Sequence, residues 1–465
     1  MQRLQLALAF LLALGLIVRI ALGWHQSQDL LADNDGYLAH AAVVASGDGF
    51  QGPYSHQPTA FRPPGYPVLL GLLKAGGASD SGAVIVVSLV CYFVIFAFTR
   101  SLARQYGLDP CWSALAVFGV ACDPLLVRYS ILPMTEVPCA AVLLAALVTF
   151  RKAVGSGSSG DQNSPWSGII AGVLFGLGTL VRPVVLLVCL FVTLFSLLRK
   201  VRQCSTGDAG LAGRLHQWFR SVSPALIAGL VLSPWVIRNA VHFHRLIPTT
   251  THGGYTLALG NNPDFYRDVI NGDDEFPWEG PALDAWQKRM IRESESQGVP
   301  AGDEPAADAW YYSQAAAAIR SEPLSFLKAT GLRLRRFWAV STNEPHGISR
   351  LIIAAVMTWY ASLWAGLILQ LLNFGFRILP EQRSMAMLWL AILAFLILHS
   401  VYWTDTRMRA PVMPIMIVIS VSGWQSASQR FLQRVVESRK AGCHEPANPM
   451  LDASNRMHRI TPTVQ

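Results

Sequence analysis

The feature that most restricts the fold is a series of apolar segments that recurs along the whole chain. Only 14% of the 465 residues are charged and 52% are hydrophobic, whereas a soluble domain carries about 25% charged residues. A helix that crosses a bilayer needs about 20 mostly apolar residues. We therefore predict an all-α polytopic membrane protein with about ten transmembrane helices. The predicted segments are residues 4–23, 82–103, 111–127, 135–151, 166–182, 183–199, 222–238, 350–373, 385–402 and 410–424.

The first apolar segment has two interpretations. Arg3 and the apolar run after it resemble a signal peptide, with a weakly cleavage-like sequence at residues 21–23. The run is longer than the usual 7–15 residues of a signal peptide's apolar core, and it carries Arg19. These two features favour a first helix that is retained in the mature protein.

The distribution of basic residues predicts the orientation of the chain. Lysine and arginine are enriched in the short cytoplasmic loops of membrane proteins. If Arg3 lies inside, the even-numbered loops and the C-terminal tail also lie inside, and both termini are cytoplasmic. Those parts contain Arg100, Arg104, Arg151, Lys152, Arg199, Lys200, Arg202, Arg214, Arg220, Arg377, Arg383, Arg430, Arg434, Arg439 and Lys440. The net charge of +8 is spread over these clusters, so we expect a topology signal and no nucleic-acid partner.

The spans divide the chain into four parts. Residues 1–238 form an N-terminal transmembrane region with a first outer loop at 24–81, and residues 350–424 form the C-terminal transmembrane helices. Between them, residues 239–349 are too long for a loop without structure of its own, and we expect a small external, periplasmic domain with surface helices near 284–295 and 306–320. Residues 425–465 form a cytoplasmic tail, polar and disordered from 441, and the composition of 155–165 is typical of a flexible linker.

The cysteines favour neither a disulfide framework nor a metal site. All seven are scattered singly, and the sequence has no Cys-x-x-Cys pair and no Cys/His cluster. Together with the short loops, this pattern favours a bacterial inner membrane. We expect no bound metal and no cofactor, although three outer acids (Asp33, Asp35 and Glu136) have the chemistry to share a cation.

Those three acids are also the candidate catalytic residues. Asp33 precedes Tyr37 by four residues, so the two side chains share a face if the segment is helical. The alternative is that Asp33 or Asp35 only caps a helix at 37–45. Glu136 opens a transmembrane segment. The helix dipole favours an acid there, but an ionisable residue in a membrane span is by default a functional hypothesis.

Several arginines lie on the outer side, against the trend of the other basic residues. Arg62 sits in a stiff turn, Phe61–Pro67, in which two prolines and a glycine fix the backbone. A guanidinium group there is suited to bidentate binding of a phosphate; alternatively, the turn is an interfacial anchor with Tyr66 in the aromatic belt. The further outer candidates are Arg128, Tyr129, Arg182, Arg238, Arg407 and Arg409, with Asp405 as a neighbouring acid. Together they predict an arginine-lined cavity that fits a lipid phosphate with a sugar attached.

In four segments the sequence resembles the GT-C membrane glycosyltransferases, the type that includes protein O-mannosyltransferases and the lipid A aminoarabinose transferase. The first segment is the acid–x–x–x–Tyr motif with Gly-Asp-Gly-Phe at 47–50, and the second is Phe61–Pro67. The third is Thr135-Glu136 at a helix start. The fourth is residues 234–239 followed by Gly253-Gly254 and by Gly260-Asn261-Asn262-Pro263. Residues 407–414 also resemble bacterial members. The order of the motifs and their shared outer side carry the resemblance, while most of 239–349 matches no pattern.

The resemblance implies a polyprenyl-phosphate-linked sugar as donor and transfer on the outer side of the membrane. Asp33 then matches the first-loop catalytic acid. Asn34 stands where the second acid is usual and Asp35 is an additional acid, so which aspartate acts is open. The expected mechanism has Asp33 as general base, Arg62 with Arg238 or Arg407 on the leaving phosphate, and inversion at the anomeric carbon.

Two other classes of protein compete with this interpretation. A transporter or flippase would use the outer arginines only to select an anionic or lipid-linked substrate. Transporters, however, often have repeated halves and sites near the bilayer midplane, and neither is evident here. A ligase or polymerase of lipid-linked glycans shares the donor class but has a different order of motifs. The expected partners are the lipid-linked sugar, membrane lipid and an acceptor (lipid, glycan or protein) that the sequence does not identify.

Overall fold

The computed structural model describes residues 2–155, 166–204, 211–272, 278, 280–341, 349–376 and 385–442. Within these ranges the regular structure is helical, apart from one isolated β-bridge between Gln51 and Pro58. The prediction of an all-α polytopic membrane protein is confirmed. The predicted linker (from residue 156) and the predicted disordered tail (from residue 443) lie outside the described residues.

Seven described helical segments are long and apolar enough to cross a membrane. They are Leu4–His25 of α1 (Gln2–His25), Asp80–Gln105 (α4), Glu136–Val154 (α7), Val184–Arg202 of α9 (Val184–Cys204), Gln217–Phe243 of α10 (Leu211–Phe243), Arg350–Leu372 of α16 (Arg350–Phe376) and Thr406–Ser438 of η4 and α18 (Thr406–Val412 and Met413–Gly442).

Three further predicted spans differ in form from a straight long helix. Helix α5 (Pro110–Cys122) and the pair α6–η2 (Pro124–Ile131) qualify together but bend by 45°. The bend lies at Asp123, whose carboxylate caps α6 by accepting a hydrogen bond from Leu126 N. Helices α8 (Trp166–Val181) and α17 (Ala386–Val401) have 16 residues each, fewer than a straight crossing needs. Nine of the ten predicted segments therefore each correspond to one helix, of which two are short, and the segment 111–127 corresponds to the bent pair α5 and α6.

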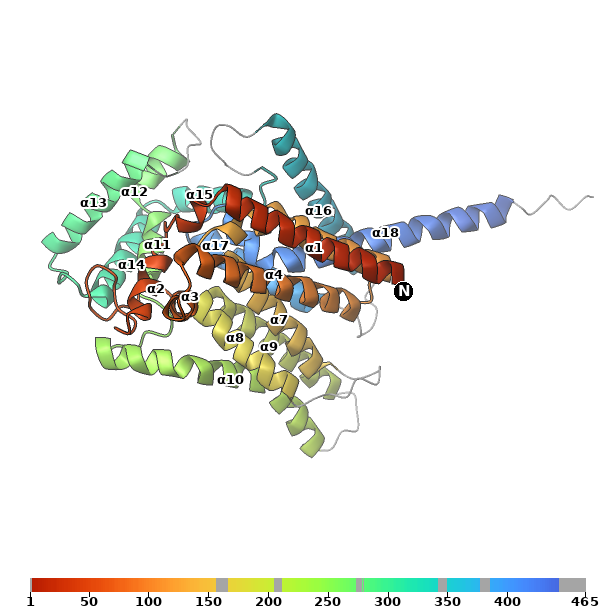
Figure 1. Cartoon of the computed structure of the whole chain (residues 1–465), viewed down its shortest axis with the longest axis horizontal. Coiled ribbons are helices and arrows are strands. Elements are labelled where there is room, and N and C mark those ends of the chain that lie inside the picture. The colour runs from red at the N-terminus through yellow and green to blue at the C-terminus, as the bar shows by residue number, and fades with distance from the viewer. Residues whose placement is uncertain are drawn as a thin grey trace, which may run out of the picture.

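The bundle has two distinct ends (Figure 1). At one end, on the left of the view, lie the short helices α2 (Tyr37–Ala45) and α3 (Gly65–Ala75) with α11 (Gly253–Leu259), α12 (Pro263–Phe265), α13 (Gly280–Ser296) and α14 (Glu304–Ser321). The segment 239–349 also contains η3 (Tyr266–Ile270) and α15 (Pro323–Phe337). The N-terminus and the last described turns of α18 lie at the opposite end. Both described ends of the chain thus lie at the same end of the bundle.

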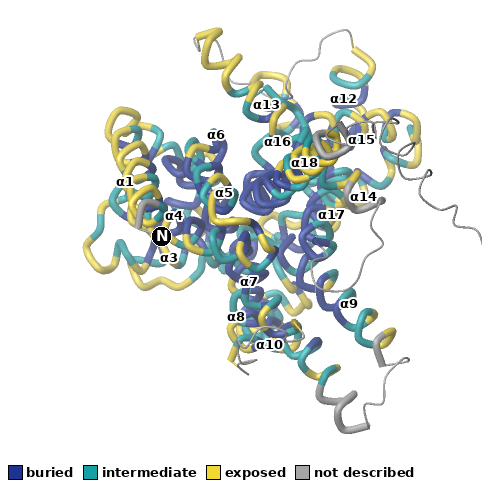
Figure 2. The backbone as a smooth tube through the Cα atoms, turned by 90° about the vertical axis from the view of Figure 1, so that its right-hand side faces the viewer, coloured by how far each residue is buried: buried dark blue, intermediate teal, exposed yellow. Residues whose placement is uncertain are grey.

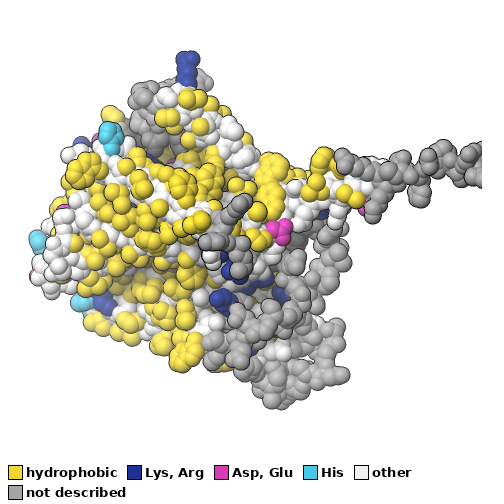
Figure 3. All heavy atoms as spheres, turned by 45° about the vertical axis from the view of Figure 1, so that its right-hand side comes forward, with side chains coloured by type: hydrophobic (Ala, Val, Ile, Leu, Met, Phe, Trp, Pro, Cys, Tyr) yellow, Lys and Arg dark blue, Asp and Glu magenta, His cyan; other side chains and the backbone are white. Residues whose placement is uncertain are grey.

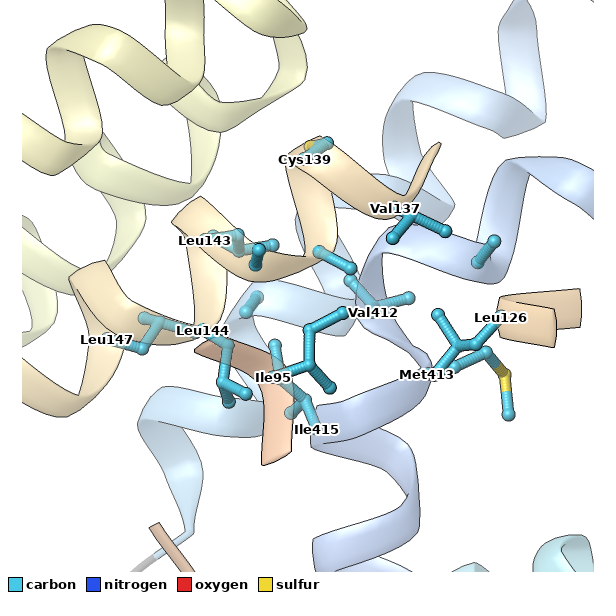
Figure 4. Packing of buried hydrophobic residues seen from close by; sticks show 14 of the residues in the cluster. Ile95, Leu126, Val137, Cys139, Leu143, Leu144, Leu147, Val412, Met413 and Ile415 are labelled. Atoms are coloured by element: carbon cyan, nitrogen blue, oxygen red, sulfur yellow. The ribbon is translucent and has the colours of Figure 1, made fainter. Parts of the chain in front are cut away.

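The centre of the bundle is α7. Most of its residues are buried, and Figure 2 shows buried backbone at the centre of the molecule and exposed backbone along α1. Its side chains pack against Ile95 of α4 and against Val412, Met413 and Ile415 of η4 and α18 (Figure 4). Because α7 is rich in alanine, neighbouring helices approach it closely. Figure 3 shows that hydrophobic side chains cover most of one face of the molecule, as expected for helices that face lipid.

Small residues bring α8 into close contact with α10. Added Cβ atoms at Gly172 and Gly176 would lie 2.7 Å and 3.0 Å from the carbonyl oxygens of Pro224 and Ala228. This Gly-x-x-x-Gly spacing puts both glycines on one helix face, where backbones pack directly. The contact fixes the end of α8, from which the chain turns towards α9.

The segment 239–349 has its own hydrophobic cluster. Its buried members lie between Ala258 and Ala329 and include Phe265, Tyr266 and Trp286. The helices expected near 284–295 and 306–320 are present as the longer α13 and α14.

Candidate functional site

Charged side chains from five separate stretches of the chain meet at the α2–α3 end of the bundle. They come from the loop before α2, the turn before α3, the first residue of α7, the turn between α8 and α9, and η4. The residues are Asp35, Arg62, Glu136, Arg182 and Arg407. We call this group, with Asp405, the charged network.

Asp35 lies between two arginines. Its Oδ1 is 3.2 Å from Arg62 Nη2, and its Oδ2 is 3.5 Å from Arg407 Nη1. Burial disfavours the charged carboxylate, but the charges of Arg407, Arg62 and Arg182 outweigh burial and hold the pKa of Asp35 below its ordinary value. Asp35 is therefore ionised at neutral pH and remains partly accessible to solvent.

Glu136 and Arg182 form the buried half of the network. Arg182 Nη2 is 2.8 Å from Glu136 Oε1, and Arg182 Nε donates to Thr135 Oγ1 at 2.9 Å. The side chain of Glu136 is 1% exposed, and its place at the first residue of α7 lets the helix dipole stabilise the carboxylate.

Arg407 joins the two halves. Its Nε is 4.0 Å from Glu136 Oε1 and 3.3 Å from Asp405 Oδ2, while its Nη1 faces Asp35. The network thus contains three guanidinium groups and three carboxylates, so their formal charges cancel. An incoming anion has to compete with a carboxylate for each arginine.

Asp33 has a different role from Asp35. Its two carboxylate oxygens accept hydrogen bonds from Leu38 N and Ala39 N, both at 2.9 Å. Asp33 therefore caps the start of α2, which was the alternative interpretation of this acid. Gly36, with φ of +75°, supplies a left-handed turn that residues with a side chain rarely adopt. The backbone therefore changes direction between Asp35 and the first residue of α2.

Aromatic rings surround Arg62. Its guanidinium group lies 5.5 Å from the ring centre of Tyr37 and 5.3 Å from that of Phe61. Tyr37 packs edge-on against Tyr66 at 5.4 Å, and both tyrosines are buried. Tyr66 is 2% exposed, so the alternative that placed it in an interfacial aromatic belt is wrong.

His252 is a neighbour of Arg62 that the sequence interpretation missed. Its Nε2 is 3.5 Å from Arg62 Nη1, and its ring contacts that of Phe61 at 4.2 Å. Because arginine only donates hydrogen bonds, Nε2 accepts and the ring proton lies on Nδ1. Burial and the charge of Arg62 lower the pKa of His252 to about 3, so the ring is neutral. A lone histidine beside Gly253-Gly254 was the available signal, but only the fold brings it to Arg62.

Arg409 and Arg238 are not in the charged network. Arg409 is fully buried and donates to the carbonyl oxygens of Phe337 and Ala339 at 2.7 Å and 2.6 Å. Arg238 donates to Thr59 O at 2.8 Å and Phe50 O at 2.6 Å. The phosphate-binding role expected for these two arginines has no support in their positions, because backbone carbonyls take up the guanidinium groups.

Of the other candidate residues, Arg128 and Asn261 connect separate elements, and Asn262 caps a helix. Arg128 pairs with Asp29 at 2.5 Å, and Tyr129 follows it, half-buried, in η2. Asn261 Nδ2 donates to Leu257 O and Val401 O, and Asn262 Oδ1 accepts from Phe265 N at the start of α12. Across the described parts of the chain, no group of three or more His, Cys, Asp or Glu side chains is arranged to hold a metal ion.

A protein-family comparison matches one part of the chain. Residues 62–212 match the model of the family described as dolichyl-phosphate-mannose-protein mannosyltransferase. This stretch contains Arg62, Glu136 and Arg182, while Asp35 and Arg407 lie outside it. A comparison with curated proteins gave no match.

Solved structures match nearly the whole chain. The Archaeoglobus fulgidus oligosaccharyltransferase in its apo form aligns with a TM-score of 0.52 at 15% identity, over 95% of this chain and 53% of that one. The A. fulgidus oligosaccharyltransferase AglB, in complex with an inhibitory peptide and a dolichol-phosphate, aligns with a TM-score of 0.50 at 14% identity, over 96% and 53%. This chain spans about half the length of these enzymes.

ArnT from Cupriavidus metallidurans bound to undecaprenyl phosphate aligns more weakly, with a TM-score of 0.39 at 15% identity, over 94% of this chain and 81% of that one. The family match and the two oligosaccharyltransferase alignments agree with the resemblance in the sequence. The chain is therefore a multi-pass membrane protein that shares the fold of the matched half of the A. fulgidus oligosaccharyltransferase.

Proposed function

We propose that this protein transfers a sugar from a polyprenyl-phosphate donor to a hydroxyl or amine of an acceptor on the outer face of the membrane. The observation that carries the proposal is Asp35, a partly accessible carboxylate between Arg62 and Arg407. A carboxylate beside two guanidinium groups provides a proton acceptor next to a site for a leaving phosphate. The family description and the dolichol-phosphate in the matched AglB structure support the donor class.

The balance of charges in the network suggests how the donor activates the base. The donor's phosphate, when it binds Arg62 and Arg407, takes the place of Asp35 as their partner. Asp35 then loses the interactions that lower its pKa, and it becomes a stronger base in the complex than in the free protein. The base is thus activated by the substrate it serves.

The proposed reaction is a single displacement. Asp35 takes the proton of the acceptor's hydroxyl or amine as the acceptor's oxygen or nitrogen forms a bond to the anomeric carbon. The bond between that carbon and the phosphate oxygen breaks, and its electron pair leaves with the lipid phosphate. Arg62 and Arg407 stabilise the negative charge that develops there. A single displacement of this kind inverts the anomeric configuration.

Arg182 and Glu136 are proposed to support the two phosphate-binding arginines, Arg62 and Arg407, without contacting the substrate. Glu136 holds Arg182 and lies 4.0 Å from Arg407 Nε, while Arg182 Nη2 is 3.8 Å from the sulfur of Met408, the residue after Arg407. We propose that these two residues orient Arg407 and that Arg182 adds positive charge to the site. Asp405, 3.3 Å from Arg407 Nε, also restrains Arg407.

We further propose that the charged network faces the periplasm of a bacterial inner membrane and that both termini are cytoplasmic. In support, basic residues close the last turns of α4 (Arg104) and α7 (Arg151 and Lys152). These ends point away from α2 and α3 in Figure 1. Residues 239–349 are proposed to form the external domain, since they contain a hydrophobic cluster of their own.

The experiment that tests the function is sugar transfer from radiolabelled polyprenyl-phosphate sugars by the purified protein. Asp35→Asn is expected to lower kcat by about 100-fold or more, the usual loss for a general base. Asp33→Asn is the matched control, because it removes the charge but keeps one of the two oxygens that accept hydrogen bonds at the start of α2. Loss with Asp33→Asn alone would move the base to Asp33. A wild type that binds the donors without cleaving them would instead support a transporter.

A further inference from the structure

The turn that carries Arg62 is held by a residue from the other half of the chain. Glu304, the first residue of α14, accepts two hydrogen bonds at Oε2, from Ala60 N and from Thr251 Oγ1, both at 2.9 Å. Thr251 N in turn donates to Ala60 O at 2.9 Å. Ala60 lies two residues before Arg62. Its backbone N–H and C=O both form hydrogen bonds with residues about 190 to 240 positions further along the chain.

The rest of the turn has few other restraints. Arg238 holds Thr59 O, and Phe61 N donates to Thr59 Oγ1 at 3.0 Å. After Arg62 come Pro63 and Pro64, which have no N–H to donate. The prolines stiffen the turn, but they do not anchor it. The segment 239–349 holds the turn by the hydrogen bonds of Ala60 with Glu304 and Thr251, and by the contacts of His252 with Phe61 and Arg62.

We propose that Glu304 is a positioning residue for Arg62, through which the external segment 239–349 sets the geometry of the phosphate-binding arginine. The inference rests on the proposed function and adds a control element to the same site. A carboxylate suits the task because its oxygen accepts two hydrogen bonds at once, and hydrogen bonds to a charged acceptor are about twice as strong as neutral ones. Next to Thr251, His252 contacts both Phe61 and Arg62, so loosening Glu304 also loosens this second support.

Three variants separate positioning from simple folding. Glu304→Ala removes the acceptor, while Glu304→Gln keeps an oxygen that accepts two hydrogen bonds. Asp303→Ala is the matched control, because Asp303 caps the same helix by accepting from Ala306 N at 2.9 Å and makes no bond to Ala60. The measurements are amide hydrogen exchange at Ala60, binding of a short-chain polyprenyl phosphate, and kcat for sugar transfer.

We expect Glu304→Ala to speed exchange at Ala60 and to lower both phosphate affinity and kcat by about tenfold, the size of the one lost hydrogen bond that restrains the Arg62 turn directly, from Ala60 N to a charged acceptor. Asp303→Ala should stay close to wild type in all three measurements, and Glu304→Gln, which keeps the acceptor oxygen but loses the charge, should fall between wild type and Glu304→Ala. In an Arg62→Gln background, Glu304→Ala should have no further effect on kcat, because the two residues act as one unit.

Two results would overturn the proposal: faster exchange at Ala60 with unchanged phosphate binding and kcat, or equal effects of Glu304→Ala with and without Arg62. Failure of the proposed function gives a different result, in which the wild type transfers no sugar from any donor. Exchange at Ala60 and phosphate binding would then still decide whether Glu304 positions Arg62.

Discussion

Arg407 and Arg409 are two residues apart, yet their guanidinium groups are in different surroundings. Arg407 Nη1 lies 3.5 Å from Asp35 Oδ2, whereas Arg409 Nη1 donates to the carbonyl oxygens of Phe337 and Ala339. Both belong to η4, a 3₁₀ helix, in which about three residues complete a turn. Positions two apart therefore point in different directions, one to the charged network and the other into the core.

Replacement of the two arginines is expected to have different effects: loss of activity for Arg407 and loss of stability for Arg409. Arg407→Gln should lower kcat/KM for the donor by about 10- to 100-fold, since a charged contact to the phosphate is worth about 1.5–3 kcal/mol, with little change in stability. Arg409→Gln should destabilise the fold by about 1–3 kcal/mol for each carbonyl left unpaired and leave the KM of the folded protein unchanged. Transfer kinetics and SDS-induced unfolding measure the two effects, and a raised donor KM in Arg409→Gln would argue against this division.

The buried pair Glu136–Arg182 gives a prediction about stability. Arg182→Met leaves the buried carboxylate of Glu136 with only the more distant Arg407, 4.0 Å away, which should destabilise the protein by about 3–5 kcal/mol. Adding Glu136→Gln in the same protein removes the buried charge, so the double variant should recover much of that loss. Unfolding midpoints in mixed micelles test this. If the two losses are additive, the pair does not have the coupling that its 2.8 Å separation indicates.

The pH dependence follows from the environment of Asp35. In the free protein burial opposes its ionisation, but Arg407, Arg62 and Arg182 hold its pKa below the ordinary value of about 3.9. A base works only when deprotonated, so activity is lost as pH falls through that pKa. The donor's phosphate weakens the influence of the arginines and raises the pKa in the complex.

The acid limb of kcat, which reports the complex, should therefore lie at higher pH than the acid limb of kcat/KM, which reports the free protein. Rate measurements across the acid range test this order. Coincident limbs, or the reverse order, would show that the phosphate does not replace Asp35 at the arginines. His252, with a pKa of about 3, should give no limb near pH 6.5.

The fold was largely predictable from the sequence because the bilayer imposes a simple rule on segment length and polarity. The charged network was predictable in part. The sequence predicts five of its members as outer charges, because the arginines run against the trend of the other basic residues, Glu136 opens an apolar span and Asp35 lies in the first outer loop. The five are Asp35, Arg62, Glu136, Arg182 and Arg407. Their common side of the membrane then indicated one site.

The choice between neighbouring residues was not predictable. Asp33 stands in the position that the resemblance favours, but its carboxylate caps α2, and Asp35, which precedes the left-handed turn at Gly36, pairs with the arginines. Arg407 and Arg409 point in different directions because they lie two positions apart in a 3₁₀ helix. The order of charged residues in the sequence does not show which of the two faces the site. His252 and Glu304 reach the site through contacts across about 190 and 240 residues, and no local signal marks such contacts.

The approach of α3 to the end of α8 gives the last prediction. A Cβ added to Gly65 would lie 2.8 Å from Leu180 O, a backbone atom that cannot move aside cheaply. Gly65 follows Arg62 by three residues, and Leu180 precedes Arg182 by two. Gly65→Ala should therefore force the Arg62 and Arg182 turns apart, with a loss of about 1–3 kcal/mol in stability from overpacking and a fall in kcat for sugar transfer.

Gly229→Ala is the matched control, because a Cβ at Gly229 in α10 meets nothing within 4 Å. That variant should be stabilised by about 0.4–1 kcal/mol and keep its kcat. The comparison of kcat between the two variants, after correction for the folded fraction, isolates the distance between the arginine turns. A Gly65→Ala protein that unfolds more easily but transfers sugar at the wild-type rate would show that this contact packs the helices without setting the site.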